Sequence, residues 1–289
     1  MDAFWIILTG CLVACSCGIL GCFLLLRKMT MIGDAISHAV LPGIVLAYFA
    51  THTYASLPML IGAALFGVLV TVFIETLHKS GKLQADAAIG ISYTLMFAIG
   101  VILISVFAGQ VDLDQDCVLY GEIIFIPFDT FSIGGWEIPR TVILLSGVCI
   151  GVVAFIWIGY KALLVTSFDP LLAQVLGIST AFWHYALMGA VSVTTVMSFE
   201  AVGAIIVVAF LVVPAATAYL LTNQLMTMLF FSVGLGCSAS VLGYYFAAAL
   251  DASIAGGMAT CLGLQFVFVF VWVEIKKSRQ KQEALSTVE

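Results

Sequence analysis

The sequence predicts an all-α protein, a polytopic bundle of transmembrane helices with about eight or nine spans. Hydrophobic residues make up 63% of the 289 residues and charged residues 9%, whereas soluble domains contain about 45–50% and about 25%. A chain with so few charges cannot cover a soluble surface of this size. Its apolar runs also reach the length of about 20 residues that a helix needs to cross the hydrocarbon core. We therefore expect one transmembrane domain over residues 1–275, followed by a tail at 276–289.

Nine apolar segments are the candidate spans. The first begins without a basic region and continues to Leu26, which favours a retained helix over a cleaved signal peptide. The sixth and seventh meet at 198–201 without a strong turn signal, so a short re-entrant element there would reduce the count to eight. The nine segments cover residues 3–26, 30–50, 57–77, 88–107, 141–160, 181–198, 201–222, 226–249 and 254–274.

The basic residues predict the orientation, because cytoplasmic loops collect Lys and Arg. With a cytoplasmic C-terminus and nine alternating spans, nine of the ten basic residues lie on the cytoplasmic side and only Arg140 lies outside. The loop 108–140 is then external. It could attract cations or a partner that delivers them, or it could simply be a solvated loop. Its acidic residues are Asp112, Asp114, Asp116, Glu122, Asp129 and Glu137.

The stretch "IGDAISHAVLPGI" places a carboxylate and an imidazole inside the second span. Asp34 and His38 are four residues apart, so their side chains leave the same face of a helix. Both groups are ligands for divalent first-row metals, and metal or ion handling is the first interpretation. A structural Asp–His hydrogen bond and a proton relay remain open. Pro42 lacks a backbone donor and predicts a kink or break, a feature that transport sites use near the membrane midplane.

A third ionisable residue, Glu200, stands at the head of a very apolar segment. A carboxylate there needs water or a cation, unless it lies at the outer interface. Because Glu200 is nearly a full membrane thickness from the inner end of its span, it can reach His38 only if one helix is broken, tilted or sunk. His184 lies between Trp183 and Tyr185 one turn into its span, and an interfacial or structural role is favoured over a role in a pathway.

The segment "SFDPLLAQVLGIST", residues 167–180, predicts a two-turn helix on the cytoplasmic side. Asp169 can cap its N-terminus and Pro170 suits the first helical position. Gly177 can end it. Its apolar side could lie on the membrane, or it could dock into a groove of a cytoplasmic partner. That side consists of Leu171, Leu172, Val175 and Leu176.

Three of these stretches together resemble one family. "GDAISHAVLPGIVLAY", "SFEAVGAIIVVAFLVVPAATAYLLT" and "FDPLLAQVLGI" are similar to the permease subunit of the bacterial zinc/manganese/iron uptake ABC transporters, in the expected order and over nearly the whole chain. The resemblance implies a homodimer in the bacterial cytoplasmic membrane, served by two cytoplasmic P-loop ATPase subunits and an extracytoplasmic metal-binding protein. It also implies that Asp34, His38 and Glu200 face the translocation path, and that Asp169–Gly177 is the coupling helix. Members usually have about eight spans.

The source of energy follows from a missing motif. The sequence has no GxxxxGK[ST] loop, so the energy has to come from another chain or from an ion gradient. With ATP hydrolysis by a partner chain, this chain is expected to be a transporter subunit and not an enzyme. A proton-coupled secondary metal transporter is the alternative. An intramembrane enzyme is disfavoured because HExxH and GxSxG are absent. We expect no permanently bound cofactor and no nucleic-acid partner. Among the transported metals zinc or manganese comes first and iron third, since carboxylate and imidazole suit all three.

Overall fold

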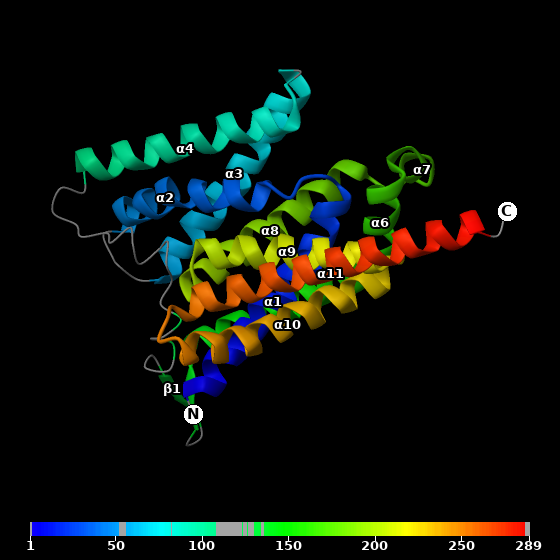
Figure 1. Cartoon of the computed structure of the whole chain (residues 1–289). Helices are drawn as coiled ribbons and strands as arrows, with labels where there is room; N and C mark the ends of the chain where they lie inside the picture. The colour runs from blue at the N-terminus through cyan, green and yellow to red at the C-terminus, as the bar shows by residue number, and fades with distance from the viewer. Residues whose placement is uncertain are drawn as a thin grey trace.

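The computed structural model shows a bundle of helices and one small β-hairpin (Figure 1). It describes residues 2–51, 56–81, 83–107, 123, 126, 130–133 and 136–286. The helices and strands are α1 (Asp2–Leu26), α2 (Ile32–Thr51), α3 (Ser56–Ser80), α4 (Ala85–Phe107), β1 (Thr130–Ile133), β2 (Trp136–Pro139), α6 (Arg140–Phe168), α7 (Pro170–Val175), α8 (Thr180–Val202), α9 (Ala204–Leu221), α10 (Leu225–Ala249) and α11 (Ile254–Ser286).

The helices form two groups with α8 between them. In one group α1 packs against α6, α9 and α10, and α11 covers α9 and α10. In the other, α2 packs along α3 and α4. Helix α8 contacts α1 and α6 on one side and α2 and α3 on the other. The largest fully buried side chains include Leu20 and Phe23 from α1 and Phe210 from α9.

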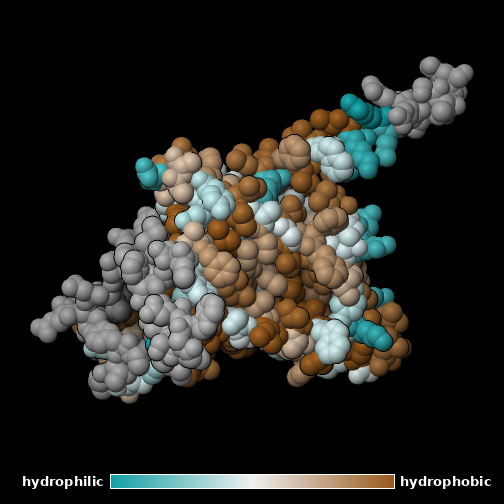
Figure 2. Space-filling view, turned by 90° about the horizontal axis from the view of Figure 1, so that it is seen from below, coloured by the Kyte–Doolittle hydropathy of each residue, from teal (hydrophilic) through white to brown (hydrophobic). Residues whose placement is uncertain are grey.

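The described residues include eight helices that are long and apolar enough to span a membrane: α1, α2, α3, α4, α6, α9, α10 and α11. The 23-residue α8 is not among these eight. The surface of the bundle is largely hydrophobic, and hydrophilic residues gather on the part of α11 that projects from it (Figure 2). The prediction of a polytopic helical bundle with eight or nine spans is therefore confirmed.

One end of the bundle collects several helix termini, and we call it the Arg27 end. Arg27, just after α1, donates hydrogen bonds to Thr166 and Ser167 in the last turn of α6. His184 near the start of α8 lies 3.0 Å from Glu75 near the end of α3. The coupling-helix candidate α7 and the C-terminal end of α11 also lie at this end, whereas α1 starts at the opposite end, where the β1–β2 hairpin lies (Figure 1).

The helix of the "LPG" stretch does not break. A kink or a break was predicted at Pro42; helix α2 continues through this proline to Thr51, so the break does not occur. The stretch instead provides a close helix contact. A Cβ atom at Gly43 would lie 2.6 Å from the carbonyl oxygen of Gly62 in α3, so the absence of a side chain lets the two backbones touch.

The break in the bundle lies at Gly203, between α8 and α9. Gly203 is the single residue between the two helices, and its φ of 84° is in the region that glycine adopts at little cost. The boundary predicted at 198–201, where no strong turn signal was recognised, lies just before this break. The signal is the glycine itself, which ends one helix and begins the next three residues after Glu200.

Two regions outside the predicted spans contain regular structure that was not predicted. The end of the loop 108–140 forms the antiparallel hairpin β1–β2, with Thr130 paired to Pro139. Most of the predicted acidic loop, including Asp112, Asp114 and Asp116, lies outside the described residues. Residues 276–286 of the predicted tail continue α11 as one helix to Ser286, and residues 287–289 lie outside the described residues.

Candidate functional site

The aspartate and histidine of α2 form a contact pair on one face of the helix. His38 Nε2 lies 3.8 Å from Asp34 Oδ1, which confirms the predicted i,i+4 arrangement. The opposite face carries Ile36 and Ala39, which are fully buried against the neighbouring helices. The burial of that face fixes the rotation of α2, and this rotation points Asp34 and His38 away from the core.

The pair is half open in the single chain. The exposed fractions are 40% for the Asp34 side chain and 36% for the His38 side chain. Both residues lie on a helix that is long and apolar enough to span a membrane, where contact of a carboxylate with lipid is costly. Their open side therefore needs water, a cation or another protein surface against it.

Two aromatic rings of α4 enclose the other side of His38. The ring of Tyr93 lies 5.3 Å from the imidazole centroid with a tilt of 31°, and Phe97 meets the imidazole edge-on at 5.5 Å. These contacts limit the rotation of the imidazole. A ligand whose orientation is restrained in this way presents its nitrogen in one direction, toward Asp34 and the open face.

Glu200 is separated from this pair along the bundle axis. A Cβ atom at Gly67 would contact both Ile36 and Ser192, so these two residues lie at the same level of α2 and α8. At 1.5 Å per residue, the backbone of Glu200 then lies roughly 9 Å further along the axis than that of His38. Within the side chains that the structure describes, no three of His, Cys, Asp or Glu form a metal-binding group. The Glu200 side chain lies outside them, so its role stays a prediction.

The helix α7 has the predicted local structure. Asp169 is the N-cap, its carboxylate accepts a hydrogen bond from the backbone N–H of Leu172 at 3.0 Å, and Pro170 occupies the first turn. Gly177 follows with a φ of 75°. Only Ala173 of this helix is buried, so its apolar side chains point outward. The exposed ones are Leu171, Leu172, Val175 and Leu176.

A second carboxylate–imidazole pair was not predicted. His184 in α8 lies 3.0 Å from Glu75 in α3, with side-chain exposures of 17% and 9%. An interfacial or structural role was favoured for His184 from the sequence, and Glu75 was not identified as its partner. Their contact joins helices that are more than 100 residues apart in the sequence, and no local pattern indicates such a partner.

Comparison with known proteins identifies the family. The model of the ABC 3 transport family matches residues 3–273. The chain is 46% identical to the manganese transport system membrane protein MntD of Bacillus subtilis over 93% of this chain and 91% of that protein. It is 40% identical to the zinc transport system membrane protein TroD of Treponema pallidum over 92% of this chain and 73% of that protein.

A solved structure has the same fold. The structure of PsaBC from Streptococcus pneumoniae in complex with Fab matches with a TM-score of 0.76 and 34% sequence identity, over 92% of this chain and 90% of the matched chain. None of these comparisons supports the proton-coupled alternative. The match to the family model covers nearly the whole chain and agrees with the helical bundle. The chain therefore belongs to the ABC 3 transport family.

Proposed function

We propose that this permease imports manganese or zinc, and that the ion passes the Asp34–His38 pair of α2. The observation that carries the proposal is the half-open pair on a membrane-spanning helix. One carboxylate and one imidazole bind a divalent ion without the strength of a closed four-ligand site, which suits a site that has to release its ion. The names of the manganese and zinc relatives support the choice of these two metals.

A homodimer explains the open side of the pair. If two copies face each other across the path, each contributes an aspartate and a histidine, and the exposed faces of α2 border a wet interior instead of lipid. Glu200 is proposed as a third acidic group of the path, displaced along the axis from the pair. An ion would then meet Glu200 first and the Asp34–His38 pair second as it moves toward the Arg27 end.

The Arg27 end is proposed to be cytoplasmic. Arg27 and Lys28 lie there, and Lys276 and Lys277 follow on α11, in agreement with the tendency of basic residues to remain inside. The exposed apolar face of α7 at this end is the proposed docking site for the ATPase subunits. The opposite end, with the β1–β2 hairpin, would receive the ion from an extracytoplasmic metal-binding protein.

Reconstitution tests the energy source. We expect proteoliposomes that contain the permease with its ATPase subunits and the binding protein to accumulate radioactive manganese or zinc only when ATP is supplied on the ATPase side. Permease alone, under a pH gradient, should accumulate neither. Robust uptake by permease alone under a pH gradient would overturn the proposal in favour of a proton-coupled transporter.

Substitution tests the ion site. Asp34→Ala and His38→Ala should each reduce ATP-driven uptake by at least about tenfold, because even the loss of groups that only support a metal ligand costs 10–100-fold. Ser37→Ala, which removes a hydroxyl from the same turn of α2, is the matched control and should transport normally. Equal amounts of folded dimer have to be present in all three variants. Normal uptake by both site variants would reduce the pair to a structural contact.

A further inference from the structure

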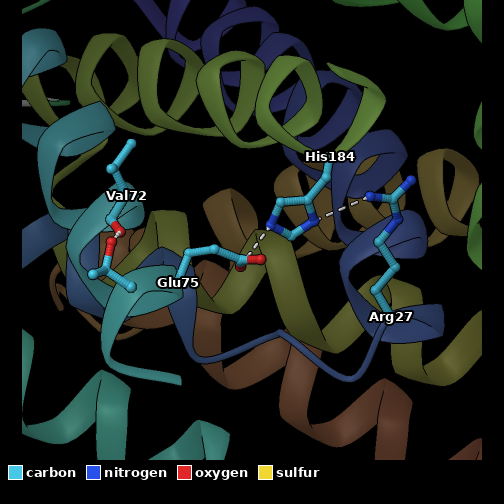
Figure 3. A network of polar contacts seen from close by, with 5 residues as sticks. Arg27, Val72, Glu75 and His184 are labelled. Carbon is cyan, nitrogen blue, oxygen red and sulfur yellow. Dashed lines mark hydrogen bonds and ion pairs between the residues drawn. The ribbon is translucent and has the colours of Figure 1, made fainter. Parts of the chain in front are cut away.

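Three ionisable side chains at the Arg27 end form one continuous network (Figure 3). The Arg27 NH1 group lies 3.4 Å from His184 Nδ1, and His184 Nε2 lies 3.0 Å from Glu75 Oε2. The other guanidinium nitrogens of Arg27 donate hydrogen bonds to Ser167 Oγ at 3.0 Å and Thr166 Oγ1 at 2.9 Å. The network thus joins the residue after α1 to the end of α6, the start of α8 and the end of α3.

The chemistry of the three groups fixes the state of the histidine. Arginine has only donors, so His184 Nδ1 has to accept from Arg27, and the ring proton is then on Nε2, which faces Glu75. A neutral imidazole in this tautomer connects a cation on one side to a carboxylate on the other. Burial lowers the pKa of Arg27, yet an arginine remains protonated at neutral pH.

One end of the network lies in the last turn of α6, directly before α7. Thr166 and Ser167 belong to the last turn of α6, and Asp169, the cap of α7, follows two residues later. Because few residues of α7 are buried, its position depends mainly on the part of α6 that precedes it. A displacement of α7 by a bound partner would therefore act first on the hydrogen bonds that Thr166 and Ser167 accept.

The other end of the network lies on α3, the helix that packs against α2 and its Asp34–His38 pair. Glu75 lies on α3, and α3 packs along α2 through the backbone contact of Gly43 with Gly62. A movement of α3 would therefore carry α2, together with Asp34 and His38. Beside the network lies a recess of about 370 Å³, lined by Glu75, His184, Ser167 and Pro170 among other residues, which gives these side chains room to rearrange.

We propose that Arg27, His184 and Glu75 are positioning residues that couple α7 to the α2–α3 pair, and that they determine how much metal is moved for each ATP hydrolysed. The inference rests on the proposed function, since it requires ATPase subunits that act on α7. These three residues do not hold the transported ion. The guanidinium beside the imidazole opposes a second positive charge, and it already occupies the nitrogen that would bind a metal through Nδ1.

Two substitutions of the same histidine test the coupling. His184→Leu removes both contacts, whereas His184→Gln supplies an amide oxygen that can accept from Arg27 and an amide N–H that can face Glu75. In proteoliposomes with the complete transporter, we expect His184→Leu to retain ATP hydrolysis within about twofold of the wild type. We expect it to lower the metal imported per ATP by at least fivefold. His184→Gln should recover more than half of the wild-type ratio.

The controls separate coupling from folding and from metal binding. His78→Leu changes another histidine of the Arg27 end, one that is exposed and hydrogen-bonds to the carbonyl oxygen of Leu83, and it should leave the metal imported per ATP unchanged. Metal affinity of the purified permease should be the same in all variants, and so should their thermal unfolding within a few degrees. A ratio for His184→Gln as low as that for His184→Leu would show that the imidazole itself binds metal or carries a proton.

The outcomes distinguish the two levels of the proposal. If the wild type transports normally and His184→Leu imports as much metal per ATP as the wild type, the coupling role is overturned and the import function remains intact. A wild-type complex that imports no metal with ATP would overturn both. Glu75→Gln keeps the oxygen that faces His184 but removes the charge, so it should lower the ratio less than His184→Leu does.

Discussion

The cap of α7 allows a quantitative prediction about ATPase docking. Asp169→Ala removes the hydrogen bond between the Asp169 carboxylate and the backbone N–H of Leu172, and loss of an N-cap costs about 1 kcal/mol. Helix α7 has six residues and buries only Ala173, so it is too short to be stable alone. The lost capping energy therefore destabilises the folded state of α7 itself, whereas the packing of the other helices does not change.

The expected size of the effect follows from the population of folded α7. A change of 1 kcal/mol alters a two-state equilibrium about fivefold. If the ATPase subunit binds only the folded helix, its apparent affinity falls in proportion to that population. The apparent Kd should therefore rise about twofold if the wild-type α7 is folded about three-quarters of the time, and about fivefold if it is folded only rarely.

A binding titration of the purified ATPase subunit against permease in nanodiscs measures this change. Asp169→Asn is the matched control, because asparagine caps a helix as well as aspartate does, and its Kd should equal that of the wild type. A Kd as high for Asp169→Asn as for Asp169→Ala would show that the charge matters and not the cap. An unchanged Kd for Asp169→Ala would refute the reasoning.

Three further predictions concern docking and packing. Leu172→Asp should weaken ATPase binding at least tenfold in the same titration and leave metal affinity unchanged; unchanged complex formation would remove α7 from the interface. Gly43→Ala should lower the free energy of unfolding by about 1–3 kcal/mol through overpacking, because its Cβ would meet the carbonyl of Gly62. Gly147→Ala is the control: its Cβ would have open space around it, so thermal unfolding should show no such loss. Gly203→Ala should cost about 1–3 kcal/mol, because φ 84° with ψ 157° is a backbone conformation found almost only at glycine. An unchanged midpoint of thermal unfolding would contradict this expectation.

Hydropathy predicted the helices well because membrane insertion is a local property of about 20 residues. The first segment, 3–26, differs from α1 by one residue at its start, and 226–249 differs from α10 by one residue. The cap at Asp169 was predictable for the same reason, since the donor is three residues away. Glu200, in contrast, could be recognised as unusual from the sequence, but its distance from His38 depends on how α8 lies against α2.

The sequence could not indicate contacts between distant segments. Arg27 meets Thr166 and His184 at separations of 139 and 157 residues, and only the assembled bundle brings them together. Helix α2 does not break at Pro42, because a membrane helix can continue through a proline when neighbouring helices hold it. Gly203 was overlooked because a single glycine between two apolar runs gives no hydropathy signal, although its backbone freedom creates the elbow.

The unbroken course of α11 sets a limit on the size and shape of whatever docks at the Arg27 end. Its 33 residues correspond to about 50 Å of helix, some 20 Å more than the hydrocarbon core is thick. The surplus projects as a stiff arm on the same side as α7 (Figure 1). A docking subunit therefore has to fit beside this arm or carry a groove for it, and the arm can exclude bulkier subunits that would otherwise recognise the same short helix.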